Sequence, residues 1–289
     1  MRQPLTIASC LFCSFSCLAA NTPEYGYSYF TLGLENVHYQ EQHGATQSSV
    51  TMLNPVLNSG GLYRINTNWD FSIDALGTFS PRSAQEQWHW RDQRLQDNQT
   101  EYLKTATHVQ LHYKWQDHWR IVAGPSFTYQ TYTRYAANTY LGQGHLQNVG
   151  TWKETMTQVY LDAGLGYDSG YLSSADGWQW KGKLTFGLPL WNRTTNSQFA
   201  DLSIDSFGFR TGLEGSLSYQ IMPGLNVGGF MLLNYEKRFA SQNKRVELNH
   251  CLTMEQGHCS EYQQRSANAL VPEADTVTFS LGLQALWRF

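Results

Sequence analysis

The chain ends in the segment 277–289, VTFSLGLQALWRF, in which apolar and polar residues alternate almost without interruption. Side chains at every second position of a β-strand share one face. One face of this strand would carry Phe279, Leu281, Leu283, Ala285, Trp287 and Phe289, and the other Ser280, Gly282, Gln284 and Arg288. Leu286 is the one exception. The pattern predicts a strand with an apolar face, a mostly polar face and an aromatic end.

This terminal strand resembles the C-terminal strand of bacterial outer-membrane β-barrel proteins, in which apolar residues face outward and the last residue is aromatic. Trp287 and Phe289 are the residues that carry the resemblance. It implies contact with outer-membrane lipid and lipopolysaccharide. It also implies recognition of this strand by the barrel-assembly machinery, with Trp287 and Phe289 as the assembly terminus.

Composition excludes a helical membrane protein and gives no support for a nucleic-acid partner. The formal net charge of the 289 residues is −3. No internal stretch reaches the eighteen or so apolar residues that a spanning helix requires. A spanning strand needs lipid-facing residues only at alternate positions, so a barrel can have a polar average composition. We therefore expect an all-β transmembrane protein.

Residues 1–20 have the zones of a secretory signal peptide. Arg2 is followed by an apolar run, and small residues close the segment. We expect cleavage after Ala20, with Ala19 as the alternative, and a single barrel domain over 21–289. Cys17 would be the acceptor in a lipoprotein, but the residues before it lack the leucine of a lipobox.

Two cysteines, Cys251 and Cys259, remain once Cys10, Cys13 and Cys17 leave with the signal. They lie close together in a polar segment, and in an oxidising compartment we expect them to form a disulfide. The chain-entropy relation gives about 2.5 kcal/mol of stabilisation for so small a loop.

Alternation recurs along the mature chain and predicts an antiparallel up-and-down barrel of about ten strands, with eight or twelve as the alternatives if a short segment is misassigned. The expected strands are 27–39, 53–65, 69–79, 105–115, 119–133, 155–167, 178–190, 207–219, 227–235 and 277–289.

The connections fall into two length classes. The short ones are 66–68, 116–118, 169–177 and 222–224, and the long ones are 42–49, 83–102, 136–150, 196–205 and 240–275. Outer-membrane barrels have short periplasmic turns and longer external loops. This predicts an outer-membrane location with both termini in the periplasm.

The inward positions of these strands collect charge of both signs. As an interior polar network or pore lining, we predict Glu35, Arg64, Asp70, Asp74, His108, His112, Arg120, Asp162, Lys181, Lys183, Arg210, Glu214, Glu236 and Arg238. Glu154, Asp168, Lys104, Lys114, Arg134, Arg193 and the apolar Trp191 are assigned inward as well. Paired charges can replace an apolar core. We favour such a plug over a narrow polar pathway.

Ten strands resemble the omptin proteases, outer-membrane enzymes with an acidic pair and an Asp–His pair in the extracellular part of the barrel. The resemblance stops at strand number. His89 and Asp92 lie in one long connection and Asp201 and Asp205 in another, and no histidine accompanies the second pair. The sequence also shows no Ser–His pair at a plausible depth. We predict no enzymatic activity, no cofactor and no metal site.

The function classes are ranked on these grounds. A structural or surface-interaction barrel comes first, a narrow porin-like channel for small polar solutes second, and an outer-membrane hydrolase third. The long connection around Cys251 and Cys259 is the place where we expect an extracellular ligand or protein to bind.

Overall fold

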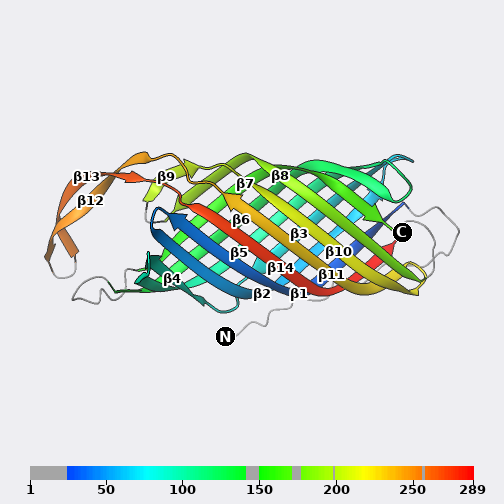
Figure 1. Cartoon of the computed structure of the whole chain (residues 1–289), viewed down its shortest axis with the longest axis horizontal. Helices are drawn as coiled ribbons and strands as arrows, with labels where there is room; N and C mark the ends of the chain where they lie inside the picture. Colours follow the sequence, from blue (N-terminus) through cyan, green and yellow to red (C-terminus); the bar gives the residue numbers. More distant parts are fainter. Residues whose placement is uncertain (1–24, 141–149, 171–176, 198, 256–257) are drawn as a thin grey trace, which may run out of the picture.

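A computed structural model describes residues 25–140, 150–170, 177–197, 199–255 and 258–289 (Figure 1). Every regular element in these ranges is a β-strand, and adjacent strands are antiparallel. None of the described residues belongs to a helix that is long and apolar enough to cross a membrane, a result that does not bear on β-barrels.

Ten strands form a closed ring. The main sheet has twelve strands, and β1 pairs with both β2 and β14 to close it. β4 pairs with β2 and β5 beyond the end of β3, and β9 pairs with β8 alone. The ring therefore matches the expected up-and-down barrel of ten strands. Its members are β1 (Gly26–His43), β2 (Thr46–Arg64), β3 (Trp69–Phe79), β5 (Gln93–Lys114), β6 (Trp119–Thr139), β7 (Trp152–Asp168), β8 (Trp178–Asn196), β10 (Gly208–Met222), β11 (Leu225–Arg238) and β14 (Glu273–Arg288).

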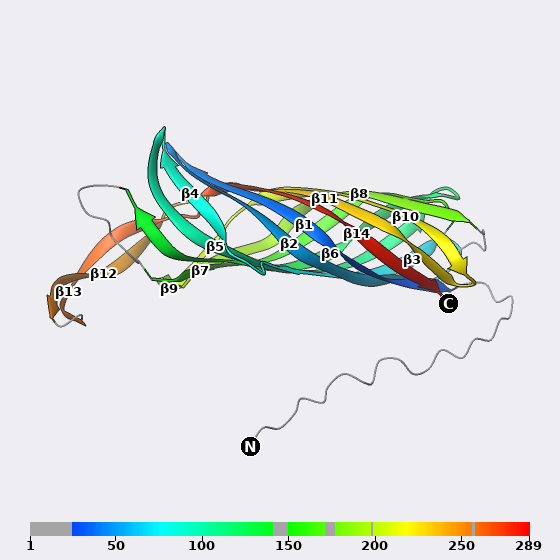
Figure 2. The same ribbon diagram turned by 90° about the horizontal axis from the view of Figure 1, so that it is seen from below.

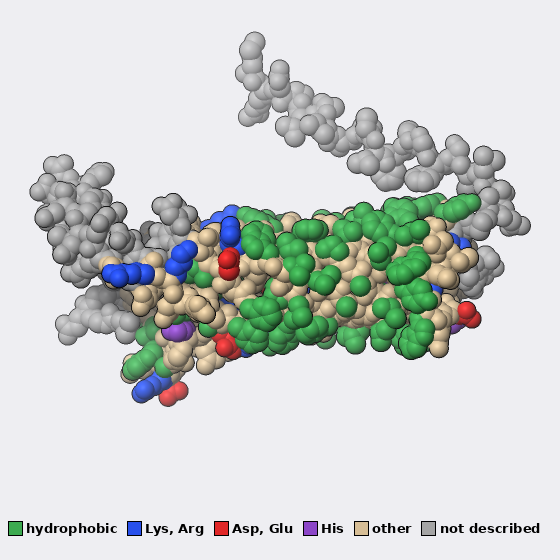
Figure 3. All heavy atoms as spheres, turned by 90° about the horizontal axis from the view of Figure 1, so that it is seen from above, with side chains coloured by type: hydrophobic (Ala, Val, Ile, Leu, Met, Phe, Trp, Pro, Cys, Tyr) green, Lys and Arg blue, Asp and Glu red, His purple; other side chains and the backbone are tan. Residues whose placement is uncertain are grey.

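The expected alternation sets the two faces of this ring. Outward side chains such as Leu32, Ile73 and Leu283 are exposed and apolar. On the face seen in Figure 3, hydrophobic side chains cover much of the barrel wall. Leu286, the exception in the terminal strand, is buried inside. A continuous apolar belt over a polar interior is the surface that lipid requires of a spanning barrel.

The start and the end of the described chain meet at one end of the barrel. The amides of Tyr25 and Gly26 donate to the carbonyl of Phe289, at 2.8 and 3.2 Å. The strands β4 (Ala84–Trp90), β9 (Phe199–Asp205), β12 (Lys244–Glu255) and β13 (His258–Ala269) lie at the opposite end (Figures 1 and 2). We call this second end the outer end.

The prediction of a loop over 42–49 is wrong. The β1–β2 pairing continues to His43 opposite Thr46, and a tight turn follows in which Gly44 has φ +58°. The segments 83–102, 196–205 and 240–275 likewise contain strands where loops were expected. β5 has 22 residues, whereas about 9–11 residues cross the hydrocarbon core. The barrel wall therefore extends well beyond the apolar belt.

The inward assignments of Trp191 and Arg193 are also wrong, because both side chains are exposed. In the pairing of β7 with β8, Val159 faces Trp191 and Tyr160 faces Pro189, which leaves Leu190 as an extra residue. Such a bulge shifts the alternation by one position. Proline cannot donate to the sheet ladder, so an irregularity beside Pro189 is expected on physical grounds.

Candidate functional site: a charged layer across the lumen and a cleft at its outer end

Apart from Arg193, the charged residues assigned to the interior are buried or half-buried. In mid-barrel, Arg210 holds Asp162 through two hydrogen bonds, from Nε to Oδ1 at 3.0 Å and from Nη2 to Oδ2 at 2.5 Å. His108 Nδ1 lies 3.7 Å from the same carboxylate. This group joins three strands, β5, β7 and β10, through one buried charge.

A second set of ion pairs lies nearer the end where the termini meet. Asp70 is fully buried and contacts Lys114 at 2.9 Å and Arg120 at 3.3 Å. Arg120 also reaches Asp168 at 2.5 Å. Buried charges are tolerated when they are paired in this way, so the network is structural at this level.

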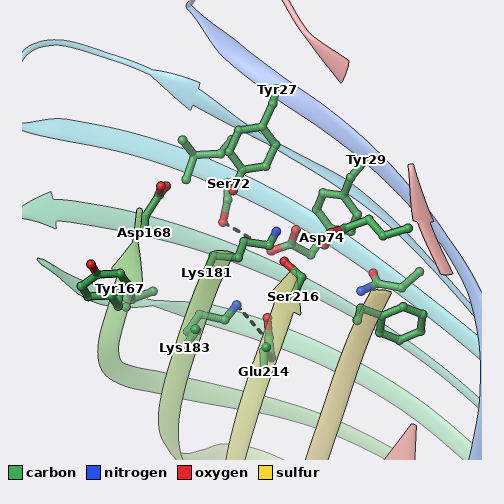
Figure 4. Close-up of a pocket in the computed structure, with 18 of the residues that line it drawn as sticks. Tyr27, Tyr29, Ser72, Asp74, Tyr167, Asp168, Lys181, Lys183, Glu214 and Ser216 are labelled. Carbon is green, nitrogen blue, oxygen red and sulfur yellow. Dashed lines mark hydrogen bonds and ion pairs between the residues drawn. The ribbon is translucent and has the colours of Figure 1, made fainter. Parts of the chain in front are cut away.

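A cavity of about 710 Å³, part of it open to solvent, lies beside these pairs (Figure 4). Lys181 points into it, with its Nζ 4.5 Å from the ring centre of Tyr29, and Lys183 pairs with Glu214 at 3.0 Å. A second space of about 880 Å³ adjoins it towards mid-barrel, and Tyr29, Asp74 and Glu214 line both.

One contact in the first cavity was missed at the sequence level. Ser72 Oγ lies 2.9 Å from His112 Nε2, and Ser72 also donates to Asp74 at 3.4 Å. The pair comes from β3 and β5, which are adjacent in the sheet. A period-two pattern places both residues inward but does not give the register that brings them together. His108 and His112 have different partners, Asp162 and Ser72.

Towards the outer end, side chains from several strands contact one another across the lumen. We call Tyr39, Glu41, Glu86, Arg134, Glu154 and Arg238 the arginine layer. Arg134 Nε donates to Glu86 at 2.7 Å, and its Nη1 donates to Glu154 at 3.2 Å. Arg238 donates to Glu154 at 2.9 Å and to Glu41 at 3.0 Å.

The arginine layer spans the diameter of the barrel. Its residues come from β1, β4, β6, β7 and β11. β6 lies four strands from β1 in one direction around the ring and six in the other. The ring of Tyr39 on β1 nevertheless stacks on that of Tyr132 on β6, with centroids 4.2 Å apart. Tyr102 packs on the other side of Tyr132 at 5.0 Å. These contacts join opposite walls of the barrel at this level.

The arginine layer lies beyond the apolar belt, because the outward neighbours of its members are polar. Lys153 precedes Glu154, Lys237 precedes Arg238, and Gln40 precedes Glu41. Glu86 belongs to β4, which pairs with β2 and β5 beyond the end of β3. The layer therefore lies in the part of the wall outside the apolar belt.

Burial and charge set the pKa values of the layer. Burial alone would raise the pKa of Glu86, but the charge of Arg134 and its hydrogen bonds hold that pKa below the usual range. The pKa of Glu154 is lowered against burial in the same way, by Arg238 and Arg134. Burial, followed by the charge of Glu154, raises the pKa of Glu41. The layer holds two arginines against three carboxylates, so Glu41 is the one that binds a proton most readily.

Above the layer lies a cleft of about 680 Å³. Glu41, Arg134 and Glu154 form its base, and Trp88 and Trp152 contribute aromatic rings. Its other lining residues are Thr194, Thr195, Asn196, Ile204, Ala269, Leu270, Val271 and Pro272. Sequence reasoning missed Glu41, Glu86 and Trp88 because they fall in or beside segments assigned to loops. The alternation of 36–41 and 84–90 was the signal that could have found them.

The other candidates are not brought together. His89 pairs across the sheet with Gln47, and Asp92 is exposed at the tip of the β4–β5 hairpin. Asp205 is exposed and contacts Arg193 at 3.4 Å. The side chains of Asp201, Cys251 and Cys259 lie outside the described residues. The backbone register sets Cys251 opposite Tyr262 and Cys259 opposite Met254. The described residues contain no cluster that could hold a metal ion.

No protein-family model matches the chain, and no curated protein matches its sequence. Among solved structures, it is similar to the outer membrane protease OmpT from Escherichia coli, with a TM-score of 0.59 and 9% identity, over 93% of this chain and 98% of that one. The β domain of the Bordetella autotransporter BrkA covers 92% of this chain and 100% of its own, with 13% identity and a TM-score of 0.42. The match to the translocator domain of the autotransporter NalP from Neisseria meningitidis covers 91% of this chain and 88% of that one, with 11% identity and a TM-score of 0.39.

At these identities the likeness shows the fold alone. The chain has the fold of an antiparallel up-and-down β-barrel, as in the outer membrane protease OmpT. A shared fold does not fix function, so the role of this barrel has to be argued from its own side chains.

Proposed function

We propose that this protein is a plugged outer-membrane barrel that acts at the cell surface as an interaction protein and does not conduct solutes. The arginine layer is the observation that carries the proposal. Arg134 is 2% exposed and Glu86 is fully buried, and the contacts between them and their neighbours cross the lumen. Opening a pathway would separate these charges inside a low-dielectric interior, which costs several kcal/mol for each unpaired ion.

Barrel size supports the same conclusion. Eight strands leave an interior that side chains can fill, and sixteen or more leave an aqueous channel. The ring of ten strands lies near the filled end. The two cavities beneath the layer are lined mainly by polar and charged side chains, and Tyr39, Tyr102 and Tyr132 do not line either of them.

The orientation follows from connection lengths. The connections at the end where the termini meet are short, and the opposite end carries the long strand extensions. We assign the first end to the periplasm and the outer end to the cell exterior. Export through the 1–20 signal, assembly through the C-terminal strand, contact with lipopolysaccharide and the Cys251–Cys259 disulfide belong to the same proposal.

The proposal assigns no catalytic activity to the protein. The Ser72–His112 contact has the distance of a nucleophile and its base, but the hydroxyl of Ser72 is shared with Asp74. Ser72 and His112 are on adjacent strands of the wall, as expected for the polar lining of a barrel. An outer-membrane hydrolase would be supported by turnover that Ser72→Ala abolishes in a folded barrel.

Liposome swelling tests the closed lumen. Vesicles containing the folded protein should swell in isotonic arabinose no faster than protein-free vesicles. The double variant Tyr132→Ala/Arg238→Ala removes side chains from both sides of the layer and should swell measurably. The control is Asn138→Ala, because Asn138 is exposed and lies beyond the layer on the same strand as Tyr132. Fast swelling by the wild type would overturn the proposal and promote the narrow channel.

A further inference from the structure

We propose that the cleft above the arginine layer binds a neutral saccharide. The proposal deepens the surface-interaction role above and rests on it, since it needs the cleft to face the exterior. The walls of the cleft come mainly from β4, β7, β8 and the segment before β14.

The charged residues at the base of the cleft already form ion pairs within the protein. Arg134 is held by Glu86 and Glu154, and Glu41 by Arg238. These ions are nearly completely buried. Recruiting one of them for a charged ligand would leave its present partner unpaired. The groups that remain for a ligand are therefore the neutral ones in the walls.

Two indole rings form part of those walls. Trp88 is held in place, since its Nε1 donates to Asn98 Oδ1 at 3.0 Å and its ring lies 5.9 Å from the guanidinium carbon of Arg134. Trp152 comes from the start of β7. Half-buried tryptophans present a rigid apolar surface with little conformational entropy left to lose. The apolar faces of sugar rings are suited to such surfaces.

The inward edge of β8 supplies a hydrogen-bonding group that lacks a protein partner. Thr194 lines the cleft and is 5% exposed, and within the described part of the chain its Oγ1 has no hydrogen-bond partner. Buried polar atoms are nearly always satisfied. The partner that the Thr194 hydroxyl lacks is of the kind that a sugar hydroxyl provides.

The composition of the cleft is consistent with this assignment. Ligand pockets combine apolar walls with a few placed polar groups. The cleft combines two tryptophans, Ile204 and the segment 269–272 with Thr194, Thr195 and Asn196. The saccharide could belong to the cell's own lipopolysaccharide or to a foreign surface, and the experiment separates the two sources.

The full-length protein, folded in detergent, is applied to a printed array that contains neutral, amino and sialylated oligosaccharides. O-chain polysaccharide from purified lipopolysaccharide of the source cell is printed beside them. We expect retention on neutral glycans. Retention on the O-chain alone would identify the cell's own surface as the source, and retention on the other neutral glycans a foreign one.

Three variants make the test specific to the cleft. Trp152→Ala and Thr194→Val should each weaken the Kd for the best neutral glycan about tenfold or more. Thr194→Val removes a hydroxyl without a protein partner, so it should fold as well as wild type on a heat-modifiability gel. Trp90→Ala is the matched control, because Trp90 is exposed on the same hairpin as Trp88 but outside the cleft; its Kd should change less than about twofold.

The inference is overturned if no neutral glycan is retained, if charged glycans are preferred, or if both cleft variants bind like wild type. If the glycan array gives one of these results and the vesicles do not swell, the saccharide site is refuted and the plugged-barrel proposal is not. If vesicles with the wild-type protein swell, the plugged-barrel proposal is refuted whatever the array shows.

Discussion

Replacing Arg134 by methionine should destabilise the folded barrel strongly. Arg134 donates to Glu86 through Nε at 2.7 Å and through Nη2 at 3.2 Å, and to Glu154 through Nη1 at 3.2 Å. Without it, the hydrogen bonds that Glu86 keeps among the described residues come from Asn98 and Thr100, at 2.7 and 2.8 Å. Glu154 retains Arg238.

The expected magnitude comes from the charge left behind. Removing one partner of a buried ion pair costs about 3–5 kcal/mol, because the other charge stays desolvated. Arg134→Met should reach this range, and adding Glu86→Met should recover part of the loss. Arg193→Ala is the matched control, since Arg193 is 46% and Asp205 70% exposed and such pairs contribute about 0–1 kcal/mol.

The effect should depend on pH. In the wild type, the lowered pKa of Glu86 lies below its unfolded value of about 4.3. The stabilisation is thus present above that value and is lost as pH falls through the folded pKa. In Arg134→Met, Glu86 is buried without its cation and should favour the protonated form. The penalty of the substitution should therefore be largest at neutral pH and shrink as pH falls below about 5.

Urea unfolding in phospholipid vesicles, followed by the gel mobility of the folded barrel, gives the free energies. A cost below about 1 kcal/mol for Arg134→Met at pH 7, or a cost equal to that of Arg193→Ala, would refute the reasoning. A loss of unfolding free energy in Arg134→Met that is larger in acid than at neutral pH would also refute it.

The remaining predictions concern the wall, the terminus and the cysteines. Gly282→Ala would place Cβ 2.2 Å from the carbonyl oxygen of Leu32 and should lower the free energy of unfolding by about 2 kcal/mol or more. The control is Gly77→Ala, whose Cβ would meet nothing within 4 Å. This variant should change the free energy of unfolding by less than about 0.5 kcal/mol in the same urea assay. Deleting Phe289 removes the carbonyl that accepts from Tyr25 and Gly26 and should reduce the fraction of heat-modifiable protein in membrane fractions, an effect that normal insertion would rule out. Cys251 and Cys259 should react with a thiol reagent after denaturation only when a reductant has been added, and equal labelling without it would show free thiols.

Much of the barrel was predictable because lipid imposes a simple rule on its strands. Each outward position in the belt must be apolar, and this makes the period of two visible in segments such as 69–79 and 277–289. The exceptions are local. Pro189 introduces a bulge that reverses the faces of Trp191 and Arg193, and a period of two cannot anticipate the extra residue.

The site was harder to predict because lipid does not constrain the wall beyond the belt. Gln40 and Lys237 are as polar as the inward Glu41 and Arg238, so contrast between the faces is lost there. The arginine layer also depends on contacts across the lumen, such as Tyr39 on Tyr132, which no pattern within one strand reveals. Ser72 and His112 illustrate the same limit for neighbours within the sheet.

Conductance in a planar lipid bilayer tests the closed lumen most directly. Folded wild-type protein should be silent, and so should Asp74→Asn/Arg210→Gln, which alters charges in the cavities beneath the arginine layer without removing any of its members. Discrete openings of the wild type whose size or ion selectivity changes in this double variant would contradict the account and make the interior a selective pathway.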